Sequence, residues 1–566
     1  MTEEIVKHLC SNGFDASIEK DRILTRHNCD KNYFEIIGGF ESESPRGLPI
    51  FYLRERKKYG SLAHIGWNNT DNKDEGMICE GVVINRHIDY ENPHIVYIGA
   101  LKKAVKTIED DLTNSEYNEQ EIINEFTAHW RHSVLNERNT AISFVEPGND
   151  IKEIEVYKPI PPTRLNYKFF IKEMKRNVNE EYMKTLVVNS QLSGSAIYLP
   201  VNFILLPPNP NTKIMDWWFD LLQRLSWKNQ DKLKTIARRN HSRQFWILGS
   251  VKIKDMNHGW FCILFSSRDK QIPPLFCASD RSSWEAVSYD VNNHIKEYIV
   301  PRGGSYLYQK ESTIVIIGCG SVGAEIARQL ASSGINNLWL IDPDSLSIEN
   351  TYRHFLGSNY LGGNKAFELS MDLKKRYPYV NATMITQLFP DDCINDDFLA
   401  KIDGIIVATG SPTEERYFNE KLFKKPYRPW VIYCWVEGHG VGGHAVYVHN
   451  SGKGCLNCLY KDAEGIKSLE SIQNFLSAEQ EFTVNLAGCG SHFLPYSFTD
   501  AIQTSILATR LALLAVEGDL NETCRMSWKN EYANKMKLKT KYRYRAFNNS
   551  LNIEPLYWED CDVCNL

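Results

Sequence analysis

Two features that would mark a membrane or secreted protein are missing from the sequence. It contains no run of about 18 or more apolar residues, the length that a membrane-spanning helix needs. Its first residues, Met1–Glu4, are acidic and are not followed by the apolar segment of a secretion signal. We therefore expect a cytoplasmic protein with no membrane partner.

A strong excess of charge of one sign is also missing. The formal net charge is -5 over 566 residues, of which 24% are charged and 43% hydrophobic. This balance is ordinary for a soluble globular protein and gives no reason to expect nucleic acid as a partner. There are no internal repeats or low-complexity tracts, and at roughly 100–200 residues per domain the length indicates three domains.

The sequence before residue 306 indicates two domains, and the second of them carries no recognisable catalytic motif. Residues 1–135 indicate an α+β unit, and residues 136–305 a mixed α/β linker or docking domain. In the first, we expect strands near 33–38 and 50–53 and helices over 96–112 and 121–135. In the second, an apolar strand over 196–206 is followed by a proline cluster that marks a turn.

Residues 306–566 have a different pattern, in which strands alternate with helices. Such alternation predicts an α/β fold with a parallel-rich sheet and helices on both faces. The predicted strand Thr313–Ile317 leads directly into a glycine-rich turn with Gly318, Gly320 and Gly323. These glycines permit close approach of backbone N–H groups to a phosphate, at the positive end of the helix that follows. A second strand about 20 residues later ends at Asp342, placed to bind ribose hydroxyls.

The residues beyond Asp342 favour ATP over NAD as the nucleotide. Asn350, Arg353 and Lys365 follow within a short stretch. A dehydrogenase has no need of two cations there, whereas an adenylating enzyme must neutralise a triphosphate and a departing pyrophosphate. An NAD-dependent dehydrogenase remains the alternative interpretation.

On these motifs, residues 311–545 or so resemble the ThiF/MoeB/ubiquitin-activating-enzyme superfamily. The resemblance implies a Rossmann-like adenylation domain that uses ATP and Mg²⁺. It also implies that Asp342 binds the ribose and that Asn350, Arg353 and Lys365 contact the nucleotide.

The chain departs from the superfamily pattern at one position. Gly410 stands where the family usually has an aspartate that helps to hold magnesium. We consider Asp344 as a replacement ligand, and Arg302 as a further phosphate contact from outside the domain.

Four of the 14 cysteines form two C-x-x-C pairs, which are Cys455 with Cys458 and Cys561 with Cys564. Two such pairs supply the four thiolates of a tetrahedral zinc site, with no open position for a catalytic water. The same two pairs recur in the ThiF/MoeB family, which favours structural zinc over a pair of redox motifs.

Two other cysteines are candidate nucleophiles. Cys489 lies among glycines and small residues before a helix expected near Ser497, which would leave its thiol accessible. Superfamily members that form thioesters place their cysteine near this position. An inert buried cysteine is the alternative.

Cys79 ends a polar stretch in the N-terminal unit that resembles a ubiquitin-conjugating-enzyme fold. His64 and Asn68 or Asn69 are similar to the His-Pro-Asn signature, although Ile65 replaces the proline. The segment Glu125–Trp130 resembles the closing helix of bacterial conjugating-enzyme-like domains. A core cysteine is again the alternative.

The order of conjugating-like, linker and adenylation domains resembles the fused enzymes of bacterial CBASS antiphage systems, which are CD-NTase-associated. The resemblance implies activation of the C-terminus of a cGAS-like nucleotidyltransferase (CD-NTase), a relay from Cys489 to Cys79, and conjugation to an amine of a target protein. It also implies a homodimer. A sister group does the same with a ubiquitin-like protein. A sulfur-carrier adenylyltransferase and a nucleotide-binding scaffold with inert cysteines are further alternatives.

Overall fold

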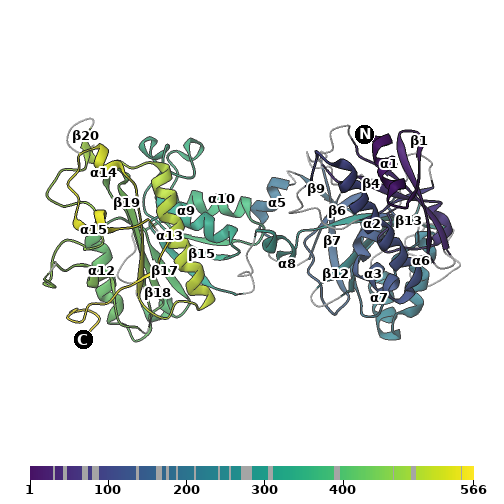
Figure 1. The fold of residues 1–566 in the computed structure, drawn as a ribbon. Coiled ribbons are helices and arrows are strands. Elements are labelled where there is room, and N and C mark those ends of the chain that lie inside the picture. The colour runs from purple at the N-terminus through teal and green to yellow at the C-terminus, as the bar shows by residue number, and fades with distance from the viewer. Residues whose placement is uncertain are drawn as a thin grey trace. The chain divides into compact units, whose positions relative to one another are not determined.

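In the computed structural model, the chain folds into two compact units (Figure 1). The first consists of residues 1–176 and 189–294, and the second of residues 177–188 and 295–566. The structure describes all residues except 30–31, 42–46, 67–73, 80–87, 135–138, 161–168, 174–177, 187–188, 210–211, 240–241, 254–256, 269–282, 304–309, 388–394, 451, 463, 486–491, 550 and 566.

The second unit is built on an eight-stranded sheet with the order β16-β15-β14-β17-β18-β19-β22-β23. The first five of these run parallel and the last three antiparallel. This is a Rossmann-like arrangement in which strand order reverses between β14 and β17. The strands are β14 (Thr313–Ile317), β15 (Asn337–Ile341), β16 (Asn381–Ile385), β17 (Gly404–Val407), β18 (Trp430–Val436), β19 (Gly442–Val448), β22 (Cys524–Lys529) and β23 (Glu554–Pro555).

Helices cover both faces of this sheet, as the alternating pattern predicts. Because successive strand residues point to opposite faces, Ile314 and Ile316 enter one core with α9 (Ser321–Ser332), α10 (Lys365–Arg376) and α13 (Phe498–Glu517). Val315 and Ile317 enter the other core with α11 (Asp396–Leu399) and α12 (Pro412–Phe423). Helix α5 (Glu180–Leu186) also belongs to this unit and contacts α10.

The first unit contains two sheets. One is a five-stranded antiparallel meander in chain order: β1 (Asp15–Glu19), β2 (Arg22–Cys29), β3 (Asn32–Gly39), β4 (Ile50–Arg54) and β5 (Glu75–Met77). Helices α1 (Thr2–Ser11) and α2 (Pro93–Thr113) share its core. The expected helix over residues 121–135 is instead two helices, α3 (Ser115–Asn124) and α4 (Phe126–Arg131), separated at Glu125.

The other sheet of the first unit has eight strands in the order β10-β11-β12-β13-β6-β8-β7-β9. An additional pairing of β10 with β7 closes seven of them into a ring. Helices α6 (Ile214–Arg224) and α7 (Trp227–Arg239) pack on it. The strands are β6 (Thr140–Ser143), β7 (Lys152–Pro159), β8 (Phe169–Glu173), β9 (Ser190–Leu192), β10 (Ser195–Val201), β11 (Gln244–Lys252), β12 (His258–Ser266) and β13 (Glu285–Asn293). The two sheets correspond to the two predicted N-terminal domains, and the three-domain division itself remains a prediction.

Across the described part of the chain, every helix is either too short or too polar to span a lipid bilayer.

Candidate active site

A cavity of about 510 Å³ lies where strand order reverses in the second unit. Its wall includes the carboxyl ends of β14, β15 and β17, at Ile317, Ile341 and Val407. Open α/β sheets bind ligands at this place, and the volume lies within the range of small-molecule sites.

The glycine-rich turn forms one side of this cavity. Gly318 has φ +89°, and a Cβ there would lie 2.8 Å from the carbonyl oxygen of Ala408. A Cβ on Gly323 would lie 1.8 Å from the carbonyl oxygen of Gly318. By contrast, a Cβ on Gly320 would meet no atom within 4 Å. Close packing therefore requires glycine at positions 318 and 323, whereas the backbone at Gly320 is open to a ligand.

Asp342 holds this turn in place. Its Oδ2 accepts a hydrogen bond from the backbone N–H of Cys319 at 2.7 Å, and its Oδ1 accepts one from the N–H of Asp344 at 2.9 Å. The residue is buried yet lines the cavity. Because each carboxylate oxygen can accept a second hydrogen bond, the predicted ribose contact is compatible with this geometry.

The cations predicted to contact phosphate lie around the same turn. Lys365, the first residue of α10, lines the cavity and its Nζ lies 3.0 Å from Oδ2 of Asp344. A smaller cavity beside the turn is lined by Asn350, Arg353 and Lys365 together. The guanidinium of Arg353 lies over the ring of Tyr496, 5.4 Å from its centroid. Asn350, Arg353 and Lys365 are therefore brought together next to the glycine turn.

Arg302 is placed differently. Its Nη1 donates to the carbonyl oxygen of Tyr298, and its guanidinium lies 3.6 Å from the centroid of the Tyr298 ring. It is not part of the wall of any cavity described above.

His354 and Glu415 are site residues that the motif analysis missed. His354 is buried, and its Nε2 lies 2.7 Å from the carbonyl oxygen of Cys319 in the glycine turn. Burial is the main cause of the lowered pKa of this imidazole, so the neutral ring donates to that carbonyl. Glu415 comes from the first turn of α12 and lines the cavity beside Thr409. The sequence signal for Glu415 is a carboxylate five residues after Gly410.

A larger cavity of about 670 Å³ adjoins the first, and the two share Gly320, Ala408, Thr409 and Glu415 in their walls. Cys489 lies outside the described residues, but the strands on either side of its segment are described. β20 (Val484–Asn485) pairs antiparallel with β21 (His492–Phe493). His492, Phe493 and Leu494 line the larger cavity.

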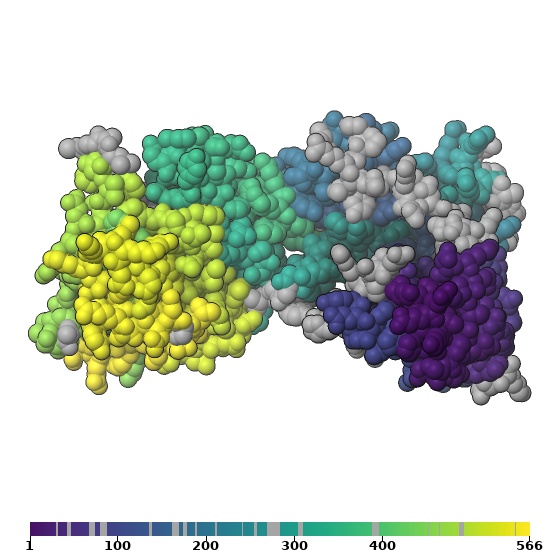
Figure 2. Space-filling model, turned by 45° about the horizontal axis from the view of Figure 1, so that its top comes forward, coloured from purple at the N-terminus to yellow at the C-terminus, as the bar shows by residue number. Residues whose placement is uncertain are grey.

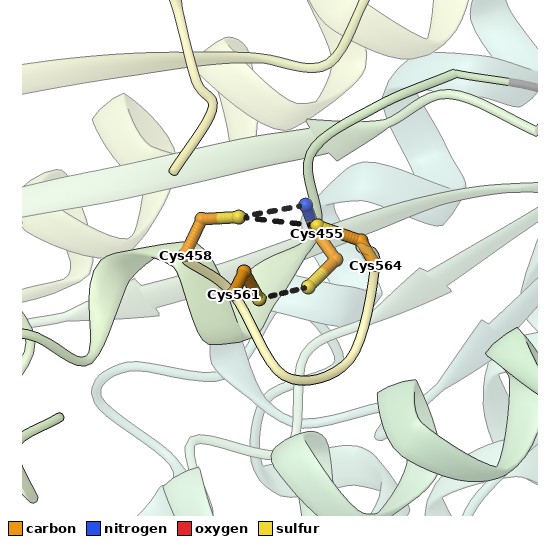
Figure 3. Close-up of side chains that lie close together, drawn as sticks. All are labelled: Cys455, Cys458, Cys561 and Cys564. Carbon is orange, nitrogen blue, oxygen red and sulfur yellow. Dashed lines mark hydrogen bonds between the residues drawn. The ribbon is translucent and has the colours of Figure 1, made fainter. Parts of the chain in front are cut away.

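Four cysteines of the second unit converge as predicted (Figure 3). All four Sγ atoms lie within 4.8 Å of one another, with Cys455 and Cys561 3.7 Å apart and Cys458 and Cys564 3.5 Å apart. A tetrahedral site with Zn–S bonds of about 2.3 Å requires sulfur atoms about 3.8 Å apart. The donor set and its spacing fit zinc. A zinc ion bound there would hold the C-terminal segment, yellow in Figure 2, to the rest of this unit.

In the first unit, Cys79 is exposed and directly follows the meander. Its backbone N–H donates to the carbonyl oxygen of His64 at 2.8 Å, beside the antiparallel bridge between Ile65 and Ile78. Cys79 and His64 are therefore cross-strand neighbours on one face. Asn68 and Asn69 lie outside the described residues.

The surroundings of His64 involve the predicted closing helix. The His64 imidazole lies between Glu121 (4.0 Å) and Glu125 (3.8 Å). His129 Nε2 lies 2.8 Å from the carbonyl oxygen of Ala63. The segment Glu125–Trp130 thus packs against the strand that pairs with Cys79.

Comparison with known proteins agrees with the fold of the second unit. The ThiF family profile matches residues 300–524, so this part of the chain is a ThiF-family domain. This assignment confirms the predicted superfamily resemblance.

Three relatives and one solved structure show the extent of the similarity. The chain is 28% identical to the ATP-dependent ubiquitin transferase-like protein Cap2 of Escherichia coli (strain TW11681), over 36% of this chain and 35% of the relative. It is also 28% identical to Cap2 of Vibrio cholerae, over 37% and 36% respectively. The molybdopterin-synthase adenylyltransferase of E. coli K12 matches at 28% over 26% of this chain and 59% of the relative. The chain thus spans about a third of the length of the first curated relatives. The crystal structure of E. coli MccB with MccA-N7isoASN aligns with 47% of this chain and 72% of that chain, at 19% identity and a TM-score of 0.32.

Proposed function

We propose that this protein activates the C-terminal carboxylate of a protein with ATP and conjugates it to an amine of a target. A carboxylate oxygen attacks the α-phosphorus of ATP, and pyrophosphate leaves. The Cys489 thiolate then attacks the acyl carbon of the adenylate, and AMP leaves. Cys79 takes the acyl group from Cys489 by thioester exchange. A target amine finally attacks that thioester, which releases the Cys79 thiolate and forms an amide.

One observation carries the adenylation step: the glycine turn, Asp342, Arg353 and Lys365 converge on the carboxyl ends of β14, β15 and β17. Arg353 and Lys365 stabilise the charge that develops on the departing pyrophosphate. The names of the Cap2 and adenylyltransferase relatives support the same chemistry.

The position of the larger cavity supports the thioester step on Cys489. It adjoins the nucleotide cavity and is bordered by residues directly after the Cys489 segment. In our proposal the substrate C-terminus occupies this cavity, and the cysteine approaches the adenylate from its rim.

Transfer to Cys79 is supported by the N-terminal unit. A helix and an antiparallel meander precede an exposed cysteine, whose backbone pairs with that of His64. This arrangement favours a conjugating-enzyme-like domain over residues 1–135, followed by a linker domain (136–305) and the adenylation domain (306–566).

We propose a CD-NTase of an antiphage CBASS system as the activated protein, on the similarity to Cap2. The alternative is a ubiquitin-like protein activated by the same chemistry. If Cys489 is inert, a sulfur-carrier adenylyltransferase remains, which the molybdopterin-synthase relative favours. We further propose a homodimer and a cytoplasmic location.

Two metals complete the proposal. Mg²⁺ would neutralise the phosphates of ATP, and zinc would be structural. The four thiols of Cys455, Cys458, Cys561 and Cys564 leave no position for a catalytic water once they surround one ion.

ATP–pyrophosphate exchange tests the adenylation step. The purified chain is mixed with Mg²⁺, ATP, labelled pyrophosphate and either a CD-NTase or a ubiquitin-like protein. We expect exchange only with a protein whose C-terminal carboxylate is intact, and loss of exchange when its last residues are removed. A rate of pyrophosphate exchange that is the same with and without the added protein would contradict the proposal.

A further inference from the structure

The end of β17 lacks the carboxylate that members of the resembled superfamily usually have there. Gly410 occupies that position with φ +67°, and a Cβ built on it would meet no atom within 4 Å. The backbone at Gly410 therefore borders open space. Another residue must therefore supply a carboxylate if a divalent cation is to bind at this strand end.

The side chain of Glu415 reaches back to this strand end from α12. Its Oε1 accepts hydrogen bonds from the hydroxyl of Thr409 and the backbone N–H of Gly410, each at 3.0 Å. Glu415 also lies in the walls of both adjoining cavities. One carboxylate is thus fixed beside Gly410, where the two cavities meet.

The charge of Glu415 has no cationic partner among the residues that the structure describes. Its side chain is buried, with 3% of the residue exposed, and its hydrogen-bond donors are a hydroxyl and backbone N–H groups. Burial raises the pKa of this carboxyl to about 7. A buried carboxylate is costly unless it is paired with a cation or coordinates a metal, so the site favours binding of a cation.

We infer that Glu415 replaces the missing aspartate and helps to hold the Mg²⁺ that accompanies ATP. This inference rests on the proposed nucleotide site. Asp344, the other candidate, is less suited because its side chain is 68% exposed and pairs with Lys365 at 3.0 Å. A lysine partner already neutralises that carboxylate.

A purely structural role for Glu415, holding the turn at Thr409 and Gly410, must be separated from metal binding. Glu415→Gln does so, because the amide oxygen can accept the same two hydrogen bonds without a negative charge. Gly410→Asp provides a rescue, since its side chain would enter open space and aspartate is one of the residues that tolerate positive φ.

The experiment measures binding of α,β-methylene ATP to the full chain by titration calorimetry, in excess Mg²⁺ and in EDTA. We expect Glu415→Gln to lower the affinity measured in Mg²⁺ by at least about tenfold, as for loss of one charge-assisted contact. The affinity measured in EDTA should stay unchanged. Adding Gly410→Asp to Glu415→Gln should restore much of the magnesium effect. Glu517→Gln, at the exposed end of α13, is the matched control and should bind as the wild type does.

Two results would overturn the inference. One is a Glu415→Gln variant that binds as tightly as the wild type in Mg²⁺, with Asp344→Asn abolishing the magnesium effect instead. The other is equal weakening in Mg²⁺ and EDTA, which would mean that Glu415 only shapes the turn. If the wild type bound no nucleotide in either buffer, the proposed function itself would fail, and this inference with it.

Discussion

The hydroxyls of Ser321 and Tyr496 lie 2.9 Å apart. Ser321 is the first residue of α9 and lies within the glycine turn, between Gly320 and Gly323, and Tyr496 lies between the Cys489 segment and α13. Arg353 lies over the same tyrosine ring. The side chain of Tyr496 thus contacts both the glycine turn and Arg353, in the segment that leads from Cys489 to α13.

We therefore expect Tyr496→Phe to affect the thioester step more than adenylation. The ring and its contact with Arg353 remain, but the hydrogen bond of about 1 kcal/mol is lost. Pyrophosphate exchange should change less than about twofold, whereas the rate of thioester formation should fall about fivefold. Equal effects on both steps would contradict this assignment.

Arg353 and Arg302 form a matched pair in the same unit. Arg353 borders the glycine turn, whereas Arg302 stacks on Tyr298. Because preorganised cations contribute strongly to charge stabilisation, Arg353→Ala should lower pyrophosphate exchange by about 10²-fold or more. Arg302→Ala should stay near the wild-type rate. A comparable loss in both variants would refute the placement of the phosphate site.

The four-cysteine site should contain about one zinc per chain, measurable by elemental analysis of the purified protein. Cys561→Ser should lose the metal and lower the melting temperature of the ThiF-family unit, because metal binding contributes directly to folding free energy. Cys10→Ser, an exposed cysteine outside the cluster, is the control. A metal-free protein with the same melting temperature would argue against structural zinc.

Glu415 should make the stability of the nucleotide-free protein depend on pH. Burial raises its pKa from 4.5 to about 7, so the folded state binds the extra proton between these values. The stability that this proton contributes is present below about pH 4.5 and is lost as pH rises through about 7. Glu415→Gln, which stays neutral, should therefore be more stable than the wild type at pH 8 by a larger margin than at pH 5. Melting temperatures at the two pH values, without nucleotide or Mg²⁺, measure the difference.

The local parts of this site could be predicted from sequence. The strand Thr313–Ile317, the helix after it and the second strand, Asn337–Ile341, all agree with the structure because glycine spacing and apolar runs act over a few residues. The convergence of the two C-x-x-C pairs was also predicted, from metal-ligand spacing and family resemblance.

Long-range features could not be predicted in this way. The pairing of β10 with β7, which closes the second sheet of the first unit, joins segments about 40 residues apart with no local signal. Glu415 was missed because it comes from the helix after the strand end, not from the strand end itself. Only the fold shows that one helical turn brings its carboxylate back to Gly410.

The most direct test of the proposed relay from Cys489 to Cys79 is a non-reducing gel of the full chain with ATP, Mg²⁺ and the candidate CD-NTase or ubiquitin-like protein. Wild type, Cys489→Ala and Cys79→Ala are compared, with and without thiol. We expect a thiol-sensitive adduct in the wild type, none in Cys489→Ala, and an adduct without final conjugate in Cys79→Ala. Adenylate formation without a thioester in any of the three proteins would contradict the two-cysteine relay and leave only the adenylation step.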